Sequence, residues 1–256
     1  MRIYVLTQED AFYIPRMLDH LLTARRDFVG IGIVPGELRR GRAMRYVRLM
    51  GPRDFLVQGA NLALHRALDL AGRVLPLDHS YSVAGAGRRH GVPTEEVAKV
   101  NAAPFVERLR SLEIDLLVSI ACPQVIKGDL IALPRHGCIN IHGALLPKYQ
   151  GLLPSFWVLA KGEAETGVTV HYMDERIDHG DIILQERVPI REGDTVHSLV
   201  SRSKIDLGKR LLVEAIDRIE RGTVQRTPLD HARASYFSFP DPAAVAEFRR
   251  RGRRFV

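Results

Sequence analysis

The sequence has little cysteine and no long apolar run. Its 256 residues include only Cys122 and Cys138, both within apolar segments and at no spacing typical of a metal site or a redox pair. We therefore expect two reduced, buried thiols. No apolar stretch approaches the roughly 18 residues that a membrane-spanning helix needs. The opening MRIYVLTQED passes from a short apolar run to acidic residues, unlike a signal peptide. These absences favour a cytoplasmic globular protein.

Acidic residues are outnumbered, since 30 Asp and Glu face 37 Lys and Arg, for a net charge of +7. The basic excess is concentrated in Glu37 to Arg48 and in Glu247 to Phe255. Each cluster alone is more typical of a solvated surface, and a groove for an anionic cofactor or substrate is the second interpretation. Neither cluster is accompanied by stacking aromatic residues, so the charge does not by itself indicate nucleic-acid binding.

Strands and helices are predicted to alternate along most of the chain. Such an order is typical of an α/β fold with a doubly wound, mostly parallel, Rossmann-like sheet. We expect strands at 2–6, 28–34, 115–121, 138–142, 167–174 and 181–190, the last two with antiparallel character. We expect helices at 14–22, at 39–71 with a break at 51–54, up to about 112 after a loop at 81–93, at 125–133, 154–159 and 196–220.

The strand CINIH, residues 138–142, carries two polar side chains on one face. Residues two apart in a strand point the same way, so Asn140 and His142 face one side while Ile139 and Ile141 face the other. Ligands of doubly wound sheets bind beyond the carboxyl ends of the strands, where this strand ends. The pair alone equally fits a turn-capping amide and a buried core histidine.

Two neighbouring segments favour a functional interpretation. The loop HGALLPKYQG that follows is rich in glycine and proline, which suits a shaped binding wall. The later loop DERIDHGDII supplies Asp174, Asp178 and Asp181, of which Asp174 and Asp181 are interpreted as turn residues. A carboxylate at Asp178 could orient His142. An amide, an imidazole and a carboxylate together are what acyl transfer to an amine needs.

The Asn-x-His at a strand end, LLPKYQG, and then ETGVTVHYMDERIDHGDII resemble the folate-dependent formyltransferases. This family includes methionyl-tRNA formyltransferase, glycinamide ribonucleotide transformylase and the amino-sugar N-formyltransferases. The resemblance extends from about Asp115 to Glu220 and is looser over Met1 to Val34. It implies a catalytic formyltransferase domain over residues 1–220, followed by a short basic extension, 221–256. The sequence pattern after FPDP itself predicts a short helix that could pack Val245 and Phe248 against the body.

The resemblance also implies residue roles. Asn140 corresponds to the amide that binds the formyl oxygen, His142 to the catalytic imidazole and Asp178 to the aspartate that orients it. The donor would be 10-formyltetrahydrofolate, with no metal, and the histidines at 136, 171, 179 and 197 have no ligand spacing. The implied folate-binding residues are Ala121, Cys122, Pro123, Gln124, Val125, Ile126, Ile177, His179 and Gly180, and the implied acceptor-binding residues are Lys148, Tyr149 and Gly151.

The acceptor is less constrained. The loop LTQEDAFYIP has no glycine to cradle a phosphate, which disfavours glycinamide ribonucleotide. The basic PGELRRGRAMRYVR lies where the methionyl-tRNA enzymes have an insertion, but 36 residues after Glu220 (256 − 220) are too few for their second domain. We therefore expect a small-molecule amine, such as a nucleotide-linked amino sugar, with methionyl-tRNA as the alternative. The oligomeric state stays open, a homodimer being one option.

Two other functions are weaker. Hydrolysis of 10-formyltetrahydrofolate is the second alternative, but such hydrolases carry an N-terminal regulatory domain, whereas the first strand here begins at residue 2. A dinucleotide loop in GAGRRHG is rejected, because His90 stands where the third glycine is required and no clear strand precedes it.

Overall fold

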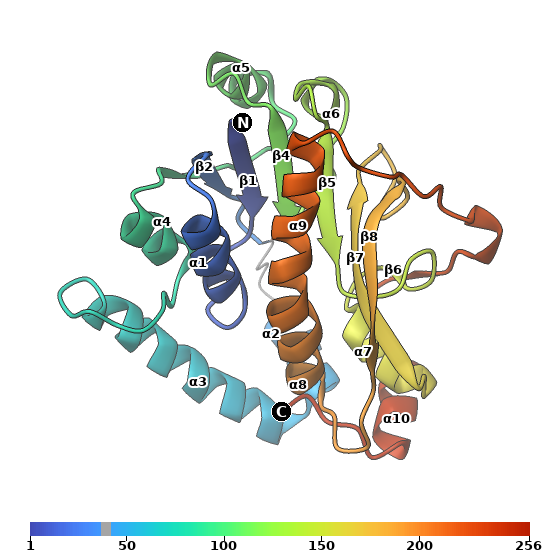
Figure 1. Cartoon of the computed structure of the whole chain (residues 1–256). Coiled ribbons are helices and arrows are strands. Elements are labelled where there is room, and N and C mark those ends of the chain that lie inside the picture. The colour runs from blue at the N-terminus through green and yellow to red at the C-terminus, as the bar shows by residue number, and fades with distance from the viewer. Residues whose placement is uncertain (37–41) are drawn as a thin grey trace.

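The computed structural model describes residues 1–36 and 42–256 and is built around a seven-stranded sheet in the order β3-β2-β1-β4-β5-β7-β8 (Figure 1). The first five strands are parallel, while β7 runs antiparallel to β5 and to β8. The strands are β1 (Ile3–Thr7), β2 (Phe28–Ile33), β3 (Thr94–Glu96), β4 (Leu116–Ile120), β5 (Cys138–His142), β7 (Glu165–Tyr172) and β8 (Ile182–Pro189). The expected α/β, mostly parallel fold is confirmed.

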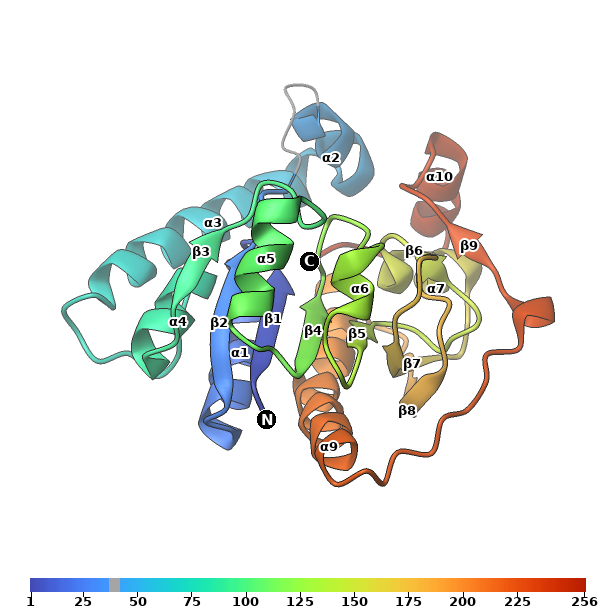
Figure 2. The same cartoon turned by 90° about the horizontal axis from the view of Figure 1, so that it is seen from above.

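Helices cover both faces of the sheet. Figure 1 shows α1 and α9 across one face, and Figure 2 shows α5 and α6 on the other. None of the helices within the described ranges is long and apolar enough to cross a membrane. The helices are α1 (Ile14–Ala24), α2 (Arg42–Met50), α3 (Pro52–Ala71), α4 (Val83–His90), α5 (Ala103–Ser111), α6 (Asp129–Ala132), α7 (Pro154–Lys161), α8 (Val196–Val200), the π-helical η1 (Ser201–Leu207), α9 (Gly208–Glu220), η2 (His231–Arg233) and α10 (Pro242–Arg250).

Strand β5 separates two apolar cores. Ile139 and Ile141 pack in the core that includes the α1 and α9 side chains, whereas Cys138 packs in the core on the α5 and α6 side. Alternate residues of a strand point to opposite faces, so Asn140 and His142 share the side of Cys138. The expected facing of the two polar side chains is thereby confirmed.

The connection between β2 and β3 departs most from the expected pattern. The predicted break in the helix at 39–71 is confirmed at Gly51, whose φ of 88° separates α2 from α3. Residues 37–41 lie outside the described residues. They include the start of the predicted helix, 39–41, and the start of the basic cluster at 37–48. The predicted loop at 81–93 contains α4, begun by Ser82, whose hydroxyl accepts from the Gly85 N–H. Its glycines concealed the helix.

The predicted helix at 125–133 is wrong in length. Only Asp129–Ala132 are helical, because Gly128 has a φ of 54° and breaks the run. Before it, Lys127 N–H donates to the side chain of Asn101, at 2.9 Å, so the backbone is held as an ordered loop instead. The longest prediction, 196–220, is a continuous helical run, but its middle turn is the π-helix η1.

Residues 221–256 run across the β8 edge of the sheet and return to the body (Figure 2). A short strand β9 (Tyr236–Phe237) pairs in parallel with β6 (Gln150–Gly151). The predicted short helix is confirmed as α10, which buries Val245 and Phe248. Phe248 stacks on Phe156 of α7 with ring centroids 4.8 Å apart. The C-terminal segment therefore builds part of the surface beside β5.

Candidate active site

A cavity of about 940 Å³ lies beyond the carboxyl ends of β1, β4 and β5. Strand order reverses between β1 and β4, and such a switch point is where doubly wound sheets bind ligands. Its floor includes Ser119, Asn140 and His142, and its walls come from the loops after β1, β4, β5 and β7 and from η1. The cavity therefore joins segments from both ends of the chain.

Asn140, His142 and Asp178 are in contact at the base of this cavity. The amide nitrogen of Asn140 donates to Oδ1 of Asp178 at 3.2 Å. Nδ1 of His142 lies 3.3 Å from Oδ2 of the same carboxylate. Both Asp178 and His142 have little exposed side-chain surface. An amide donor, an imidazole and a carboxylate thus lie in contact at the carboxyl end of β5.

His171 is a fourth member of the cluster. It pairs with Asn140 across the antiparallel β5–β7 ladder, and its Nε2 lies 3.2 Å from the Asn140 amide nitrogen and 3.5 Å from Asp178 Oδ1. Its Nδ1 lies 2.7 Å from the Tyr172 carbonyl oxygen. A carbonyl only accepts, so Nδ1 carries the proton and Nε2 accepts from Asn140. This arrangement fixes which way the Asn140 amide points.

The backbone around Asp178 is held in an unusual conformation. Its φ is 50°, in the left-handed region that non-glycine residues seldom adopt. The Gly151 N–H donates to Asp178 Oδ2 at 2.9 Å, and the Gln150 side chain donates to the Asp178 carbonyl oxygen at 2.9 Å. Such strain persists where surrounding contacts impose it, often at functional sites. The loop carrying Asp178 is therefore fastened to β6 rather than free.

Burial and neighbouring charge act in opposite directions on this pair. Burial lowers the pKa of His142, and the Asp178 carboxylate partly offsets that effect. Burial alone would raise the pKa of Asp178, but His142, His171 and the Gly151 N–H more than offset it and hold that pKa well below its usual range. Asp178 is therefore ionised at neutral pH, beside an imidazole that burial inclines to stay neutral.

The implied folate-binding residues fall into two groups. Ala121, Cys122, Pro123, Gln124, Val125 and Ile177 line the cavity. Ile126, His179 and Gly180 do not: Ile126 is fully buried in the core near α6, and His179 is held by Asp174 at 2.6 Å. Gly180 lies against the Tyr172 carbonyl, where a Cβ would come within 2.2 Å of oxygen. These three residues therefore lie outside the cavity lining.

Side-chain hydrogen bonds join the loop after β4 to the segment at 98–101. Gln124 donates to the Ala98 carbonyl oxygen at 2.8 Å, and Asn101 donates to the Val125 carbonyl oxygen at 2.8 Å. Val125 remains 36% exposed and Ile177, on the Asp178 loop, 42%. Two exposed apolar side chains on facing loops of one cavity suit a flat aromatic ring. The two loops therefore present exposed apolar side chains at the cavity.

The implied acceptor-binding residues differ in position. Gly151 lines the cavity, whereas Lys148 and Tyr149 do not. Lys148 is exposed and Tyr149 is buried. The Tyr149 hydroxyl donates to Glu163 at 2.6 Å and its ring stacks on Phe237. The Tyr149 backbone, however, reaches the site, because its carbonyl oxygen lies 2.8 Å from Nε2 of His142. The sequence located this loop but not which atoms of it face the site.

Several lining residues escaped sequence reasoning. His171 has no metal-ligand spacing in the sequence, and only the β5–β7 register places it opposite Asn140. Lys204 on η1 also lines the cavity and was not among the predicted site residues. Arg45 and Tyr46 of α2 reach Phe239 of the C-terminal segment, with Arg45 4.4 Å above the ring. No local pattern signalled that long-range contact.

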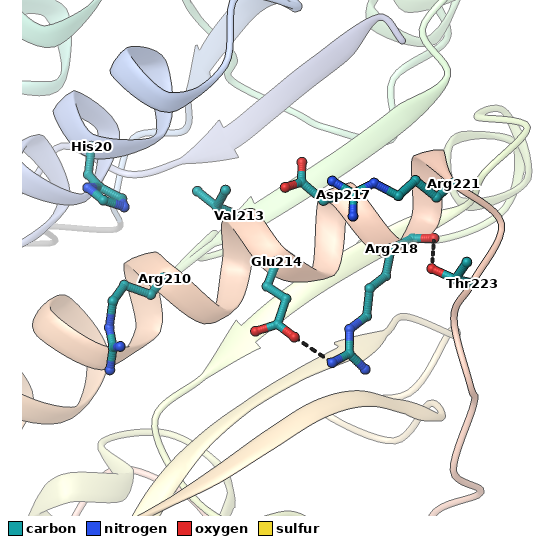
Figure 3. Close-up of a pocket in the computed structure, with 8 residues that line it drawn as sticks. All are labelled: His20, Arg210, Val213, Glu214, Asp217, Arg218, Arg221 and Thr223. Carbon is teal, nitrogen blue, oxygen red and sulfur yellow. Dashed lines mark hydrogen bonds and ion pairs between the residues drawn. The ribbon is translucent and has the colours of Figure 1, made fainter.

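A second hollow of about 520 Å³ lies against α9, on the face of the sheet that α1 and α9 cover (Figure 3). Arg218 in its wall pairs with Glu214, and Asp217 pairs with Arg25. It contains no buried amide or imidazole paired with a carboxylate. Over the described residues, no group of three or more His, Cys, Asp or Glu side chains could hold a metal ion. The larger cavity, which holds the amide, the imidazole and the carboxylate, is therefore the candidate active site.

Comparison with known proteins identifies relatives of this chain in sequence and in fold. Residues 92–216 match the family model described as formyl transferase. Methionyl-tRNA formyltransferase of Geobacter metallireducens is 40% identical over 147 residues, 57% of this chain and 47% of the relative. That of Pelotomaculum thermopropionicum is 34% identical over 197 residues, 72% of this chain and 61% of the relative. The chain spans about half the length of the first curated relatives it matches.

Solved structures share the fold at lower identity. Glycinamide ribonucleotide transformylase 1 from Symbiobacterium toebii superposes with a TM-score of 0.61 at 21% identity, covering 90% of this chain and 95% of that one. A sugar N-formyltransferase from Shewanella superposes with a TM-score of 0.57 at 18% identity, covering 93% and 76%. At these identities the likeness is one of fold. Asn140, His142, His171 and Asp178 all lie within residues 92–216, the segment that matches the family model.

Proposed function

Because this chain belongs to the formyl transferase family, we propose that it transfers a formyl group from 10-formyltetrahydrofolate to a primary amine. The observation that carries the proposal is the contact of Asn140 and His142 with Asp178 at the base of one cavity. The bound folate would supply an activated formyl carbon. The chain's own residues would orient it, stabilise the charge that develops on the formyl oxygen, and move protons.

Asn140 would stabilise the formyl oxygen. Its amide nitrogen has two protons, which are directed at Asp178 and His171 at 3.2 Å each. The formyl oxygen would replace one of these acceptors, and the other contact would keep the amide oriented. A donor already aimed in this way needs little rearrangement as negative charge builds up, which is the basis of oxyanion stabilisation.

His142 and Asp178 would handle the proton. Nε2 of His142 donates to the Tyr149 carbonyl, which leaves Nδ1 of the neutral ring without a proton and next to the carboxylate. A proton taken from the attacking amine can lie between Nδ1 and Oδ2, where the imidazolium is stabilised by the ionised Asp178. The same proton can then pass to the leaving nitrogen.

The relatives favour a different acceptor from the small amine that the sequence alone suggests. Those named above are methionyl-tRNA formyltransferases, so the methionyl amine of a charged tRNA is the first acceptor we propose. A small amine is the second candidate, because Tyr46 and Phe239 meet edge to face with ring centroids 5.6 Å apart and both line the cavity. Aromatic side chains in the lining would suit a small ligand.

One assay tests both candidates. The protein is mixed with 10-formyltetrahydrofolate, and release of tetrahydrofolate is followed with methionyl-tRNA, with a panel of amino sugars and other small amines, and without acceptor. Formyl product with an acceptor, absent in an Asn140→Ala variant, supports the proposal. Equal release with and without acceptor indicates hydrolysis and contradicts it. No release under any condition contradicts formyl transfer altogether.

A further inference from the structure

Lys204 is the one lysine in the cavity lining, and no role assigned above uses it. It lies on η1, where each turn holds an extra residue and the helix is locally wider. Ser203 next to it donates its hydroxyl back to the Leu199 carbonyl at 2.6 Å, and Ile205 after it is buried. The π-helical turn therefore holds a lysine between two inward-packed residues, at the cavity wall.

Neighbouring cations on the same helical run are paired. Arg202 binds Asp194 through two nitrogens, and Lys209 lies 3.9 Å from Asp206. Lys204 differs: across residues 1–36 and 42–256, no carboxylate oxygen lies within ion-pair distance of its ammonium group. The lysine is thus a cation without a direct partner in the described chain.

Asp10 and Asp178 are the carboxylates whose charges act on Lys204. Both accept hydrogen bonds from other groups. Asp10 accepts from the N–H groups of Phe12, Tyr13 and Ile14 at the start of α1. Asp178 accepts from Gly151 and Asn140. Both act on Lys204 only at a distance. Their charges raise the pKa of its ammonium group, but burial lowers that pKa by more. Lys204 is partly buried at the cavity wall, and a partly buried charge without a contacting partner is costly, so an anion brought by a ligand would stabilise it.

We propose that Lys204 binds an anionic oxygen group of the formyl acceptor, a carboxylate or a phosphate, and so fixes the acceptor's amine near Asn140 and His142. This inference rests on the proposed function and adds the acceptor's chemical class. A phosphate could come from the terminal nucleotides of a charged tRNA or from a small phosphorylated amine, whereas a carboxylate would come from a small amine. Arg45 and Arg176, the other cations of the lining, come from α2 and the Asp178 loop.

Anion binding can be tested without any turnover. The chain contains only six lysines, so a protein labelled with ¹³C at lysine Cε gives few signals, and the signal absent in Lys204→Met identifies this residue. We expect acetate or inorganic phosphate to shift the Lys204 signal saturably, with a half-effect at about 10 mM or below. The response to acetate against phosphate distinguishes the two anion classes.

Lys209 supplies the internal control, since it is on the same helical run and pairs with Asp206. Chloride at matched ionic strength supplies the second control, because salt screens exposed charges without occupying a site. A Lys204 signal that responds no more than that of Lys209, or equally to chloride, would overturn the inference. That result would leave formyl transfer itself intact.

Turnover gives a second measurement once the transfer assay has identified an acceptor. Lys204→Met should raise the KM for that acceptor by about 10- to 100-fold, the loss expected for a hydrogen bond to a charged group. The KM for 10-formyltetrahydrofolate should stay within twofold, and Lys204→Arg should recover part of the loss. Lys209→Met should behave as the unaltered protein. A rise in the folate KM instead would contradict an acceptor role.

Discussion

Nδ1 of His142 lies 3.3 Å from Oδ2 of Asp178, on the side of the ring opposite the nitrogen that meets the Tyr149 carbonyl. The neutral ring is therefore held through Nε2, and the Asp178 carboxylate would bind Nδ1 as well once that nitrogen gains a proton. Asp178 in turn depends on β6, since the Gly151 N–H and the Gln150 side chain fix its carboxylate and its backbone. The loop after β5 thus positions both members of the pair.

Replacing the carboxylate should remove most catalysis. Asp178→Asn keeps the shape but loses the charge that stabilises an imidazolium, so kcat should fall by about 10²- to 10³-fold. Steady-state kinetics with the identified acceptor measure it. Asp174→Asn is the matched control, because Asp174 lies on the same loop and contacts Arg176 and His179 rather than His142. Equal losses in the two variants would mean that loop disorder, not charge, is responsible.

Asn140 should affect the chemical step more than binding. Asn140→Ala removes the donor aimed at the developing charge, which predicts a loss in kcat of about 10²-fold with little change in the folate KM. The control is Asn61→Ala on the exposed surface of α3. An Asn140→Ala enzyme that keeps its kcat but binds folate weakly would move this residue from catalysis to binding.

The His142 imidazole should titrate below its ordinary pKa of 6.5, because burial disfavours its charged form. The ring is then neutral, and able to accept a proton, at all pH values above that lowered pKa. Histidine NMR titration measures it, with His142→Gln to assign the signal. In Asp178→Asn the pKa should fall further, since the carboxylate raises it. A midpoint that rises in that variant would contradict this electrostatic account.

Gly151 should tolerate no side chain. Its φ is 96°, and a Cβ there would lie 2.3 Å from the Phe237 carbonyl oxygen. Gly151→Ala should therefore separate β6 from β9, release Asp178 and lower both kcat and the thermal midpoint. Gly193→Ala is the matched control, because nothing lies within 4 Å of the added atom. Normal activity in Gly151→Ala would show that the β6–β9 contact does not support the site.

The C-terminal segment should contribute strongly to stability. Phe248 is 1% exposed and stacks on Phe156, so Phe248→Ala should lower the free energy of unfolding by about 3 to 5 kcal/mol. Urea denaturation measures it. Arg250→Ala, on the exposed side of the same helix, should change it by less than about 0.5 kcal/mol. Similar values for both variants would indicate that α10 is docked only loosely.

The sequence predicted the parts of the fold that depend on local periodicity. The alternation in β5 and β7 and the spacing of α1 and α9 are period signals, and they located Asn140 and His142 at a strand end. The π-helical turn at η1 has no such signal, because its apolar spacing resembles that of an α-helix. Glycines likewise concealed α4, since Ser82 begins a helix that propensity disfavours.

The rest of the site depends on pairing across the chain. His171 joins the cluster only because β7 pairs antiparallel with β5 in one register. Phe239 reaches Tyr46, and Tyr149 turns its carbonyl rather than its hydroxyl to His142, through contacts that no single segment specifies. Side-chain type identified the chemistry, whereas only tertiary structure decided which atoms carry it.

The pairing of β6 with β9 has a consequence for how the protein is made. Gln150 N–H donates to the Ser235 carbonyl, and Leu152 N–H to that of Phe237, across a long separation in the chain. Residues 235–237 follow all seven strands of the large sheet in the chain, so they emerge after those strands during synthesis. A nascent chain leaving the ribosome would therefore have its sheet before it had a fixed Asp178 loop, and would become competent only after residues 235–237 had emerged and docked.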